Sequence, residues 1–324
     1  MRRALGFVLL FVSPPFLKPW LLRWIVGARV GQHVSVGWFT TVRGRTIALG
    51  DHASIRACTV IRCGGDVRLG RSAEISSFTL VYGAASLALG DHSYIGPQSL
   101  INCEEDVRLG HHTALGARAV VYTHGSWLPY TEGYWVRFAP VVLGDYVWCA
   151  AGVFLHPGTE IGSQTFVNSR SVVAGVIPGG VVVEGVPARV VAPLERVRRK
   201  MTPPRVDAAI REMLLHFVEA ELRRTRGLEV EEISDGWRVQ TPAARRIVLL
   251  ASGGPAMPPQ PPSGERTLYL VNRPGVRLPD TGPPAMVDFT TSTAATGNDE
   301  IFEAFVVFIR RYYGVRMERS GRER

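Results

Sequence analysis

The sequence predicts a mainly β domain built as a triangular solenoid, followed by a small α/β domain. Two nested periods predict the solenoid. Between Leu49 and Leu109, a Leu-Gly pair followed by Ile or Leu six residues after the Leu occurs four times, at a spacing of 20 residues. Within these blocks an aliphatic residue recurs every six residues. An internal period of this kind indicates the architecture before any local propensity is considered.

The aliphatic column continues from residue 30 to residue 173 with one interruption. Of its 21 positions, 20 hold Ile, Leu or Val and one holds Cys149. One aliphatic residue in six is too sparse for an amphipathic helix, so the column predicts short strands, three to a coil, whose aliphatic side chains face a shared axis. A β-sandwich does not keep such a column in phase over this length. We expect about seven coils. The column consists of Val30, Val36, Val42, Leu49, Ile55, Ile61, Leu69, Ile75, Val81, Leu89, Ile95, Ile101, Leu109, Leu115, Val121, Leu143, Cys149, Leu155, Ile161, Val167 and Val173.

Two other positions of the six-residue repeat support the coils. The position four residues after each aliphatic residue is mostly small or β-branched, which fits a crowded inner corner. Glycine often follows the aliphatic residue, as at Gly50, Gly70 and Gly90. We expect the bends to need a permissive backbone there. Because the 20-residue spacing exceeds three repeats of six, two extra residues should bulge at one corner of each early coil.

The N-terminal segment, residues 1–29, is apolar and is broken by Pro14, Pro15 and Pro19. Its apolar run is shorter than the ~20 residues that span a bilayer, and no small-x-small cleavage site follows it. We expect a helical cap over the open end of the solenoid, because every solenoid needs one. Its aromatic, aliphatic and Arg-bearing composition also fits a monotopic membrane contact, and the two roles are compatible.

Residues 193–324 lack the six-residue repeat and predict the small α/β domain. An amphipathic helix is expected over residues 205–226, a Pro-rich loop over 253–264, and a last helix capped by Asn298 and ending near Tyr313. Asp288 and Glu300 lack the spacing of a nuclease-like pair, so we expect an interaction or substrate-presenting module. The predicted strands are Leu228–Ile233, Trp237–Gln240, Ile247–Ala251, Leu268–Asn272 and Met286–Thr290.

Charge and cysteine content limit the expected partners and the expected cellular compartment. The formal net charge is +9, but no block of five or six like charges occurs, so we expect no nucleic-acid partner. The basic run at residues 196–200 is interpreted as a linker or an anion contact. Four cysteines do not make a disulfide framework in 324 residues, so the cytoplasm is the expected compartment.

Three motifs resemble a known family. They are the interruption after Val121, the run Val142-Leu-Gly-Asp-Tyr-Val-Trp-Cys, and Gly185-Val-Pro-Ala-Arg. Residues 28–192 thereby resemble the hexapeptide-repeat acyltransferases, which include maltose, galactoside and polysaccharide O-acetyltransferases. The resemblance implies a left-handed parallel β-helix over residues 30–192, assembled as a homotrimer. It also implies acetyl-CoA as co-substrate, no metal, and a hydroxyl of a sugar or surface polysaccharide precursor as acceptor.

His124 matches the family's catalytic histidine, in an aromatic-rich loop from Thr123 to about Pro140. Acetyl transfer needs a base that takes the proton of the acceptor hydroxyl, and imidazole titrates near working pH. A long loop that interrupts a regular solenoid is a usual place for function. The alternative is a loop histidine that only packs among aromatic side chains.

The resemblance also implies binding residues. On the acceptor side they are Glu104 and Trp127, and the corner at residues 104–106 either binds sugar hydroxyls or is an exposed turn. Gly96 stands where galactoside-type enzymes carry Asn, so a simple galactoside is not the expected acceptor. The family's basic residue is absent at Gly175, which leaves Arg189 or Arg170 to meet the CoA phosphates. The implied CoA-binding residues are Ala151, Ser169, Ala174, Gly175 and Arg189.

His52, His92 and His112 share the fourth position of their repeats. His92 and His112 should stack on adjacent coils ~4.8 Å apart, a spacing compatible with a metal. The γ-type carbonic anhydrases, a related β-helix family, use three histidines across a trimer interface, which makes a metal-dependent hydratase the first alternative function. An outward, solvated ladder of turn residues is the favoured interpretation of these histidines. A second alternative is a catalytically silent β-helix scaffold.

Overall fold

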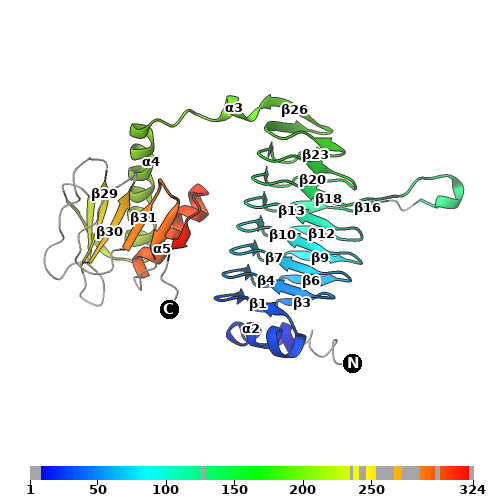
Figure 1. Ribbon diagram of the computed structural model, residues 1–324, viewed down its shortest axis with the longest axis horizontal. Coiled ribbons are helices and arrows are strands. Elements are labelled where there is room, and N and C mark those ends of the chain that lie inside the picture. The colour runs from blue at the N-terminus through cyan, green and yellow to red at the C-terminus, as the bar shows by residue number, and fades with distance from the viewer. Residues whose placement is uncertain are drawn as a thin grey trace. The chain divides into compact units, whose positions relative to one another are not determined.

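The computed structural model describes residues 9–125, 128–233, 236–240, 246–252, 266–271, 285–295 and 300–320. The chain divides into two compact units, Met1–Arg199 and Lys200–Arg324. Figure 1 shows the first unit as a stack of coils and the second as a sheet with helices.

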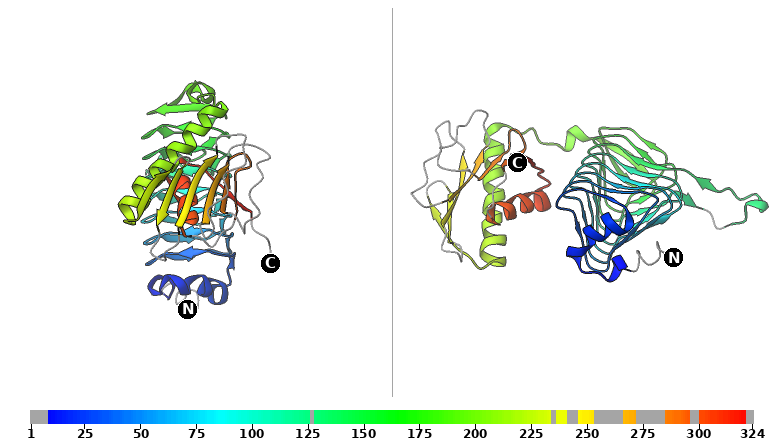
Figure 2. Two further views of the ribbon diagram at one scale, coloured as in Figure 1. Left: turned by 90° about the vertical axis from the view of Figure 1, so that its left-hand side faces the viewer. Right: turned by 60° about the horizontal axis from the view of Figure 1, so that its bottom comes forward.

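The first unit is a β-helix of three parallel sheets, and each coil gives one strand to each sheet (Figure 2). Seven coils have all three strands, which confirms the predicted fold, and β24 and β25 begin an eighth. The first sheet contains β1 (Arg29–Val30), β4 (Ile47–Leu49), β7 (Val67–Leu69), β10 (Leu87–Leu89), β13 (Val107–Leu109), β18 (Val141–Leu143), β21 (Glu160–Ile161) and β24 (Val176–Ile177). The second contains β2 (Ser35–Val36), β5 (Ser54–Ile55), β8 (Glu74–Ile75), β11 (Tyr94–Ile95), β14 (Ala114–Leu115), β19 (Trp148–Cys149), β22 (Phe166–Val167), β25 (Val181–Gly185) and the antiparallel β26 (Ala188–Pro193). The third contains β3 (Thr41–Arg43), β6 (Val60–Cys63), β9 (Leu80–Gly83), β12 (Leu100–Asn102), β15 (Val120–Val121), β20 (Phe154–Leu155) and β23 (Val172–Val173).

The aliphatic column forms the core of the β-helix. From Val36 to Val173 every column residue is at most 4% exposed, and Val30 packs against the same cluster. The small residues four positions later, such as Ala73, Ser93 and Thr113, are also buried. Burial of each Ile, Leu or Val side chain contributes ~1.5–3 kcal/mol, so the column is the main source of stability.

The reason predicted for the glycines was wrong. Gly50, Gly70 and Gly90 do not have positive φ angles. Instead, a Cβ on Gly90 would lie 2.6 Å from the carbonyl carbon of Gly110 in the next coil. The glycines therefore allow neighbouring coils to approach. The left-handed conformation falls on the non-glycine residue two positions later, as at His52, with φ 58°.

The N-terminal segment closes one end of the stack with helical turns. These are η1 (Pro15–Leu17), α2 (Lys18–Leu21) and the π-helical η2 (Leu22–Val26), which ends at Gly27. Leu10, Leu21 and Leu22 are buried in the same cluster as the coils. Among the described residues, no helix is both long enough and apolar enough to cross a bilayer.

Lys18 of α2 is fully buried between the cap and the first coil. Its Nζ donates to the carbonyl oxygens of Gly37 (2.7 Å) and Thr40 (3.0 Å). Burial lowers the pKa of Lys18 from 10.5 to about 8. The unfolded chain therefore holds this proton to higher pH than the folded chain, so the Lys18 contribution to stability should rise between about pH 8 and pH 10.5. We expect the melting temperature of the wild type, relative to Lys18→Met, to rise across this range. A difference that stays flat with pH would contradict this expectation.

The first unit ends with the short helix α3 (Leu194–Val197), which contacts β25 and β26. The second unit contains a mixed seven-stranded sheet. Two helical segments, α4 (Pro203–His216) with the π-helical η4 (Phe217–Thr225), and α5 (Glu300–Tyr313), contribute Phe217, Phe302 and Phe305 to its core. All five expected strands are present within about two residues, and β32 and β33 were not expected. Asn272, Asn298 and the Pro-rich loop at 253–264 lie outside the described residues. The strands are β27 (Glu229–Ile233), β28 (Gly236–Gln240), β29 (Arg246–Ser252), β30 (Arg266–Val271), β31 (Ala285–Asp288), β32 (Thr293–Ala295) and β33 (Glu318–Ser320).

Candidate functional site

The long interruption of the repeat folds into a hairpin. It leaves the β-helix after β15, at the corner between the third and first sheets where the earlier coils carry their two extra residues. β16 (His124–Gly125) pairs antiparallel with β17 (Arg137–Phe138), and η3 (Tyr130–Glu132) lies between them. Figure 1 shows this hairpin projecting away from the coils.

His124 lies at the base of this hairpin. Its half-buried ring stacks on Phe138, with ring centroids 5.1 Å apart and an interplanar angle of 22°. The Nδ1 atom of His124 is buried and has no hydrogen-bond partner among the described residues. A buried polar atom without a partner costs ~1–3 kcal/mol, and such atoms are rare in native structures. This nitrogen is therefore a polar group that the described residues leave unsatisfied.

Buried polar groups fix the base of the hairpin. The Thr123 hydroxyl donates to the backbone carbonyl of Asn102 (3.0 Å) and contacts the Asn102 side-chain oxygen (3.2 Å). The same hydroxyl oxygen accepts the backbone N–H of Glu105 (3.0 Å). The acidic corner at residues 104–106 therefore lies directly beside the residue that precedes His124. Asn102 was not predicted, although a polar residue inside an otherwise aliphatic strand is a signal for it.

The carboxylates of the acidic corner differ in their partners. Asp106 accepts the backbone N–H of Ser86 (3.1 Å) and pairs with Arg108 (2.6 Å). Burial opposes ionisation of Asp106, but these hydrogen bonds outweigh it and lower the pKa of its carboxyl. Glu104 is half-buried and accepts the backbone N–H of Ala84 at 3.3 Å. Asp106 is thus a structural residue, and Glu104 is the better placed to meet a ligand.

An aromatic row lies on the third sheet near His124. Burial and a hydrogen bond with Tyr122 raise the pKa of Tyr82. Tyr122 stacks on Phe154 (5.8 Å), which in turn contacts His156 (4.8 Å). These residues were not predicted as a site, although the 20-residue spacing places Tyr82, Asn102 and Tyr122 in successive coils. Trp127 lies outside the described residues.

The residues expected to bind CoA fall at two corners. Ala151 and Ser169 lie at the corner between the second and third sheets, where the Arg170 N–H donates to the Ala151 carbonyl (3.0 Å). Arg189 faces Glu184 across β25 and β26, and the Glu184 carboxylate accepts from Asn168 (2.8 Å), so Arg189 belongs near this corner.

The second CoA corner holds Ala174 and Gly175, which follow β23, between the third and first sheets. Arg118 was not predicted. It occupies the same position of its repeat as Arg170, and both side chains are exposed.

The three histidines of the alternative metal site do not form one group. His92 stacks on His112 (4.9 Å, 12°) and His112 stacks on Tyr146, whereas His52 stacks on His33. His92 is only 8% exposed, so the expected solvated ladder was wrong at this residue. Stacked parallel rings place their faces, not their nitrogens, toward one another. In the described part of the chain, no three His, Cys, Asp or Glu residues gather as metal ligands would.

Parts of the chain are similar to known proteins. No protein-family model matches the chain. The protein named as the colanic acid biosynthesis acetyltransferase WcaF of Escherichia coli is 38% identical over 61 residues, which are 19% of this chain and 34% of that protein. The galactoside O-acetyltransferase of Escherichia coli is 38% identical over 52 residues, 16% of this chain and 26% of that protein. The matches thus span about a quarter to a third of these relatives.

Solved structures were also compared. The hexapeptide-repeat acetyltransferase VCA0836 of Vibrio cholerae, complexed with acetyl-CoA, has 23% identity and a TM-score of 0.34, and the match covers 60% of this chain and 85% of that one. The N-acyltransferase AntD of Bacillus cereus, complexed with dTDP-4-amino-4,6-dideoxyglucose and CoA, has 19% identity and a TM-score of 0.36, with 56% and 92% covered. Because both TM-scores are low, these structures do not decide the fold. The fold is assigned from the pairing of the strands in the β-helix itself. The sequence matches confirm the expected resemblance: the matched segment is similar to hexapeptide-repeat acetyltransferases.

Proposed function

We propose that this protein is an O-acyltransferase that moves an acetyl group from acetyl-CoA to a hydroxyl of a sugar or surface polysaccharide precursor, with His124 as general base. The observation that carries the proposal is the His124 ring, whose buried Nδ1 lacks a partner among the described residues. The ring lies in the one long insertion of a regular β-helix, beside the Glu104 corner. The relatives' names support acetyl transfer, and the dTDP-sugar bound to AntD supports a sugar acceptor.

The chemistry assigned to the chain is a proton transfer in a fixed geometry. His124 takes the proton of the acceptor hydroxyl as the oxygen attacks the thioester carbonyl, and it returns that proton to the CoA thiolate that departs as the C–S bond breaks. The Thr123–Asn102 contacts hold the hairpin base, and the stack on Phe138 fixes the ring. Holding the hydroxyl and the thioester together supplies much of the remaining rate. Glu104, and Trp127 outside the described residues, are the proposed acceptor contacts.

The corner near Ala151 suits a phosphate-bearing co-substrate. The exposed guanidinium groups of Arg118 and Arg170 belong to this corner, and Arg189 belongs near it. Arg side chains recognise phosphate groups well because they can donate two parallel hydrogen bonds. Acetyl-CoA, when bound, supplies the activated acetyl group. We propose that Ala151, Ser169, Ala174 and Gly175 line its path, and we expect no metal.

We also propose a homotrimer, because the third sheet has an apolar outer face. The register places these outward apolar residues in one row across six of its seven strands, from β6 to β23, and Leu80 is 41% exposed. A second copy covering this face would also provide the second wall of a CoA groove and reach the projecting hairpin. Light scattering should give about three times 35.5 kDa. The row is Val60, Leu80, Leu100, Val120, Phe154 and Val172.

The test of the function is release of the CoA thiol from acetyl-CoA, with and without sugar acceptors. Acceptor-dependent release supports the proposal. No release with any sugar, sugar nucleotide or polysaccharide fragment would favour the silent scaffold, and a stable monomer that turned over acetyl-CoA would remove the trimer. Because none of the four cysteines is in a disulfide, we place the reaction in the reducing cytoplasm.

The hydratase is the alternative function, although the stacking of His92 on His112 turns ring faces, not ring nitrogens, toward one another. In such a trimer, ligands could come from neighbouring subunits. Stoichiometric zinc in the purified protein, lost in His92→Ala, would favour it over acetyl transfer.

A further inference from the structure

The N-terminal cap turns aromatic side chains outward. Phe16, Trp20 and Trp24 are 79%, 56% and 70% exposed, and they follow one another at a spacing of four residues. This spacing places them on one side of the helical turns. Lys18, Leu21 and Leu22 occupy the other side and are buried. The cap therefore closes the β-helix with three leucines, Leu10 among them, and a lysine, while its largest apolar side chains face outward.

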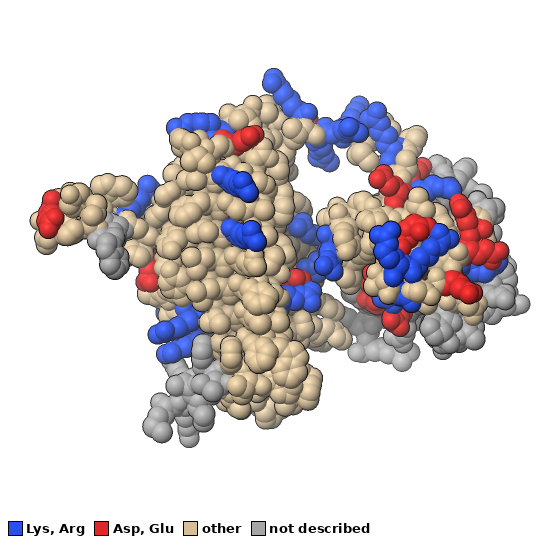
Figure 3. Space-filling model, turned by 180° about the vertical axis from the view of Figure 1, so that it is seen from behind, with Lys and Arg blue, Asp and Glu red and all other residues tan. Residues whose placement is uncertain are grey.

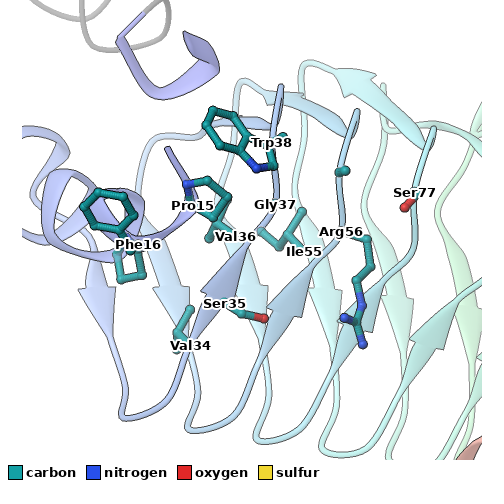
Figure 4. A pocket seen from close by; sticks show the side chains of 12 residues that line it. Pro15, Phe16, Val34, Ser35, Val36, Gly37, Trp38, Ile55, Arg56 and Ser77 are labelled. Atoms are coloured by element: carbon teal, nitrogen blue, oxygen red, sulfur yellow. The ribbon is translucent and has the colours of Figure 1, made fainter. Parts of the chain in front are cut away.

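The first coil extends this apolar area. Trp38 and Phe39 are about half exposed and lie 6.1 Å apart between ring centroids, and Phe39 lies 5.8 Å from Phe11 of the cap. Residues of the cap and of the first three coils line a groove of about 530 Å³. Figure 4 shows Phe16 at one end of the labelled residues that line it and Ser77 at the other, with Arg56 near Ser77. Exposed apolar residues are ordinary when scattered, but a contiguous set marks an interaction surface.

The charged residues of the cap and the first coil have one sign. Residues 1–50 contain six Arg and one Lys and no Asp or Glu. Lys18 is buried, but Arg29 and Arg43 are exposed on the first coil. Figure 3 shows the same end of the β-helix, at the bottom, as a tan surface without acidic groups on that face. Such a surface complements an anionic partner.

We infer that this aromatic face, defined as Phe16, Trp20, Trp24, Trp38 and Phe39, docks on an anionic membrane surface. Trp side chains favour the interfacial layer of a bilayer, where their rings meet both apolar and polar groups. Basic residues beside them add attraction to anionic headgroups. The described helical turns are too short to cross the bilayer, so the face lies on the membrane. This inference does not depend on acetyl transfer, and it would place the chain beside lipid-linked acceptors.

The experiment is cosedimentation of the full chain with vesicles of phosphatidylcholine containing about one third phosphatidylglycerol. We expect the wild type to bind and the F16S/W20S/W24S variant to lose at least tenfold in affinity. A matched control, V176S/L215S/V307S, removes three exposed apolar side chains elsewhere and should bind like the wild type. Arg29→Gln and Arg43→Gln should each weaken binding about fivefold, and less at high salt.

Three outcomes would overturn the inference. The first is a wild type that stays in the supernatant. The second is a triple variant, with an unchanged melting temperature, that binds as well as the wild type. The third is equal binding to vesicles of pure phosphatidylcholine. If the triple variant instead abolishes a concentration-dependent self-association without vesicles, a second copy of the chain occupies this face and the membrane inference fails.

Discussion

Replacing His124 with alanine is expected to lower acetyl-transfer turnover by ~10²–10⁴-fold, the usual contribution of a positioned general base. The hairpin projects from the β-helix, and the aliphatic column does not include His124, so folding should survive. Affinity for acetyl-CoA should survive as well, because the proposed CoA corner lies at Ala151 and Arg170. The expected signature is a large loss of turnover with a nearly unchanged KM for acetyl-CoA.

A matched control separates this role from mere packing. His52→Ala also removes a stacked ring, but from an exposed turn in an early coil, and should keep near-full turnover. Phe138→Leu removes the ring under His124 while keeping an apolar side chain, and should cost less than His124→Ala. If His124→Ala kept near-full activity while His92→Ala and His112→Ala abolished it, the proposed base would be wrong and a metal site would be favoured.

The sequence could predict the β-helix because its core is a one-dimensional pattern. Each column residue repeats the same environment, so the phase of Ile and Leu along the chain gives the strands and the number of coils. The interruption after Val121 likewise predicts where a functional insertion leaves the stack. These inferences need only the spacing of residues. The spacing of 20 is confirmed by the parallel register, which pairs Leu89 with Leu69 and with Leu109.

The hydrogen bonds that hold the base of the hairpin at the candidate site could not be predicted in the same way. The Thr123–Asn102 and Thr123–Glu105 contacts join residues 18 to 21 positions apart, across a corner whose path depends on two extra residues. The cap was also only half predictable. Helical spacing indicates a cap, but it does not say that Lys18 is buried while Trp20 and Trp24 are exposed. That choice depends on the carbonyl groups of Gly37 and Thr40, which the first coil presents.

The glycines of the repeat lead to a second large expected effect. Gly90→Ala should destabilise the β-helix by at least about 3 kcal/mol, the upper part of the range for overpacking. The added Cβ would lie 2.6 Å from the Gly110 carbonyl carbon and 2.7 Å from the His111 nitrogen. Both are backbone atoms held by parallel strand pairing on either side, so they cannot move aside as a flexible side chain would. The loss of backbone freedom in the unfolded chain favours alanine by only ~0.4–1 kcal/mol, which is too little to compensate.

Gly125→Ala is the matched control, because it makes the same change where there is room. Gly125 has no positive φ, and a Cβ there meets no described atom within 4 Å. Its free energy of unfolding should stay within about 0.5 kcal/mol of the wild type. Calorimetric unfolding of the three proteins decides the matter. If Gly90→Ala had the same melting temperature as the wild type, the coils would be able to move apart at this position. Close approach of the coils would then not explain the repeated glycines.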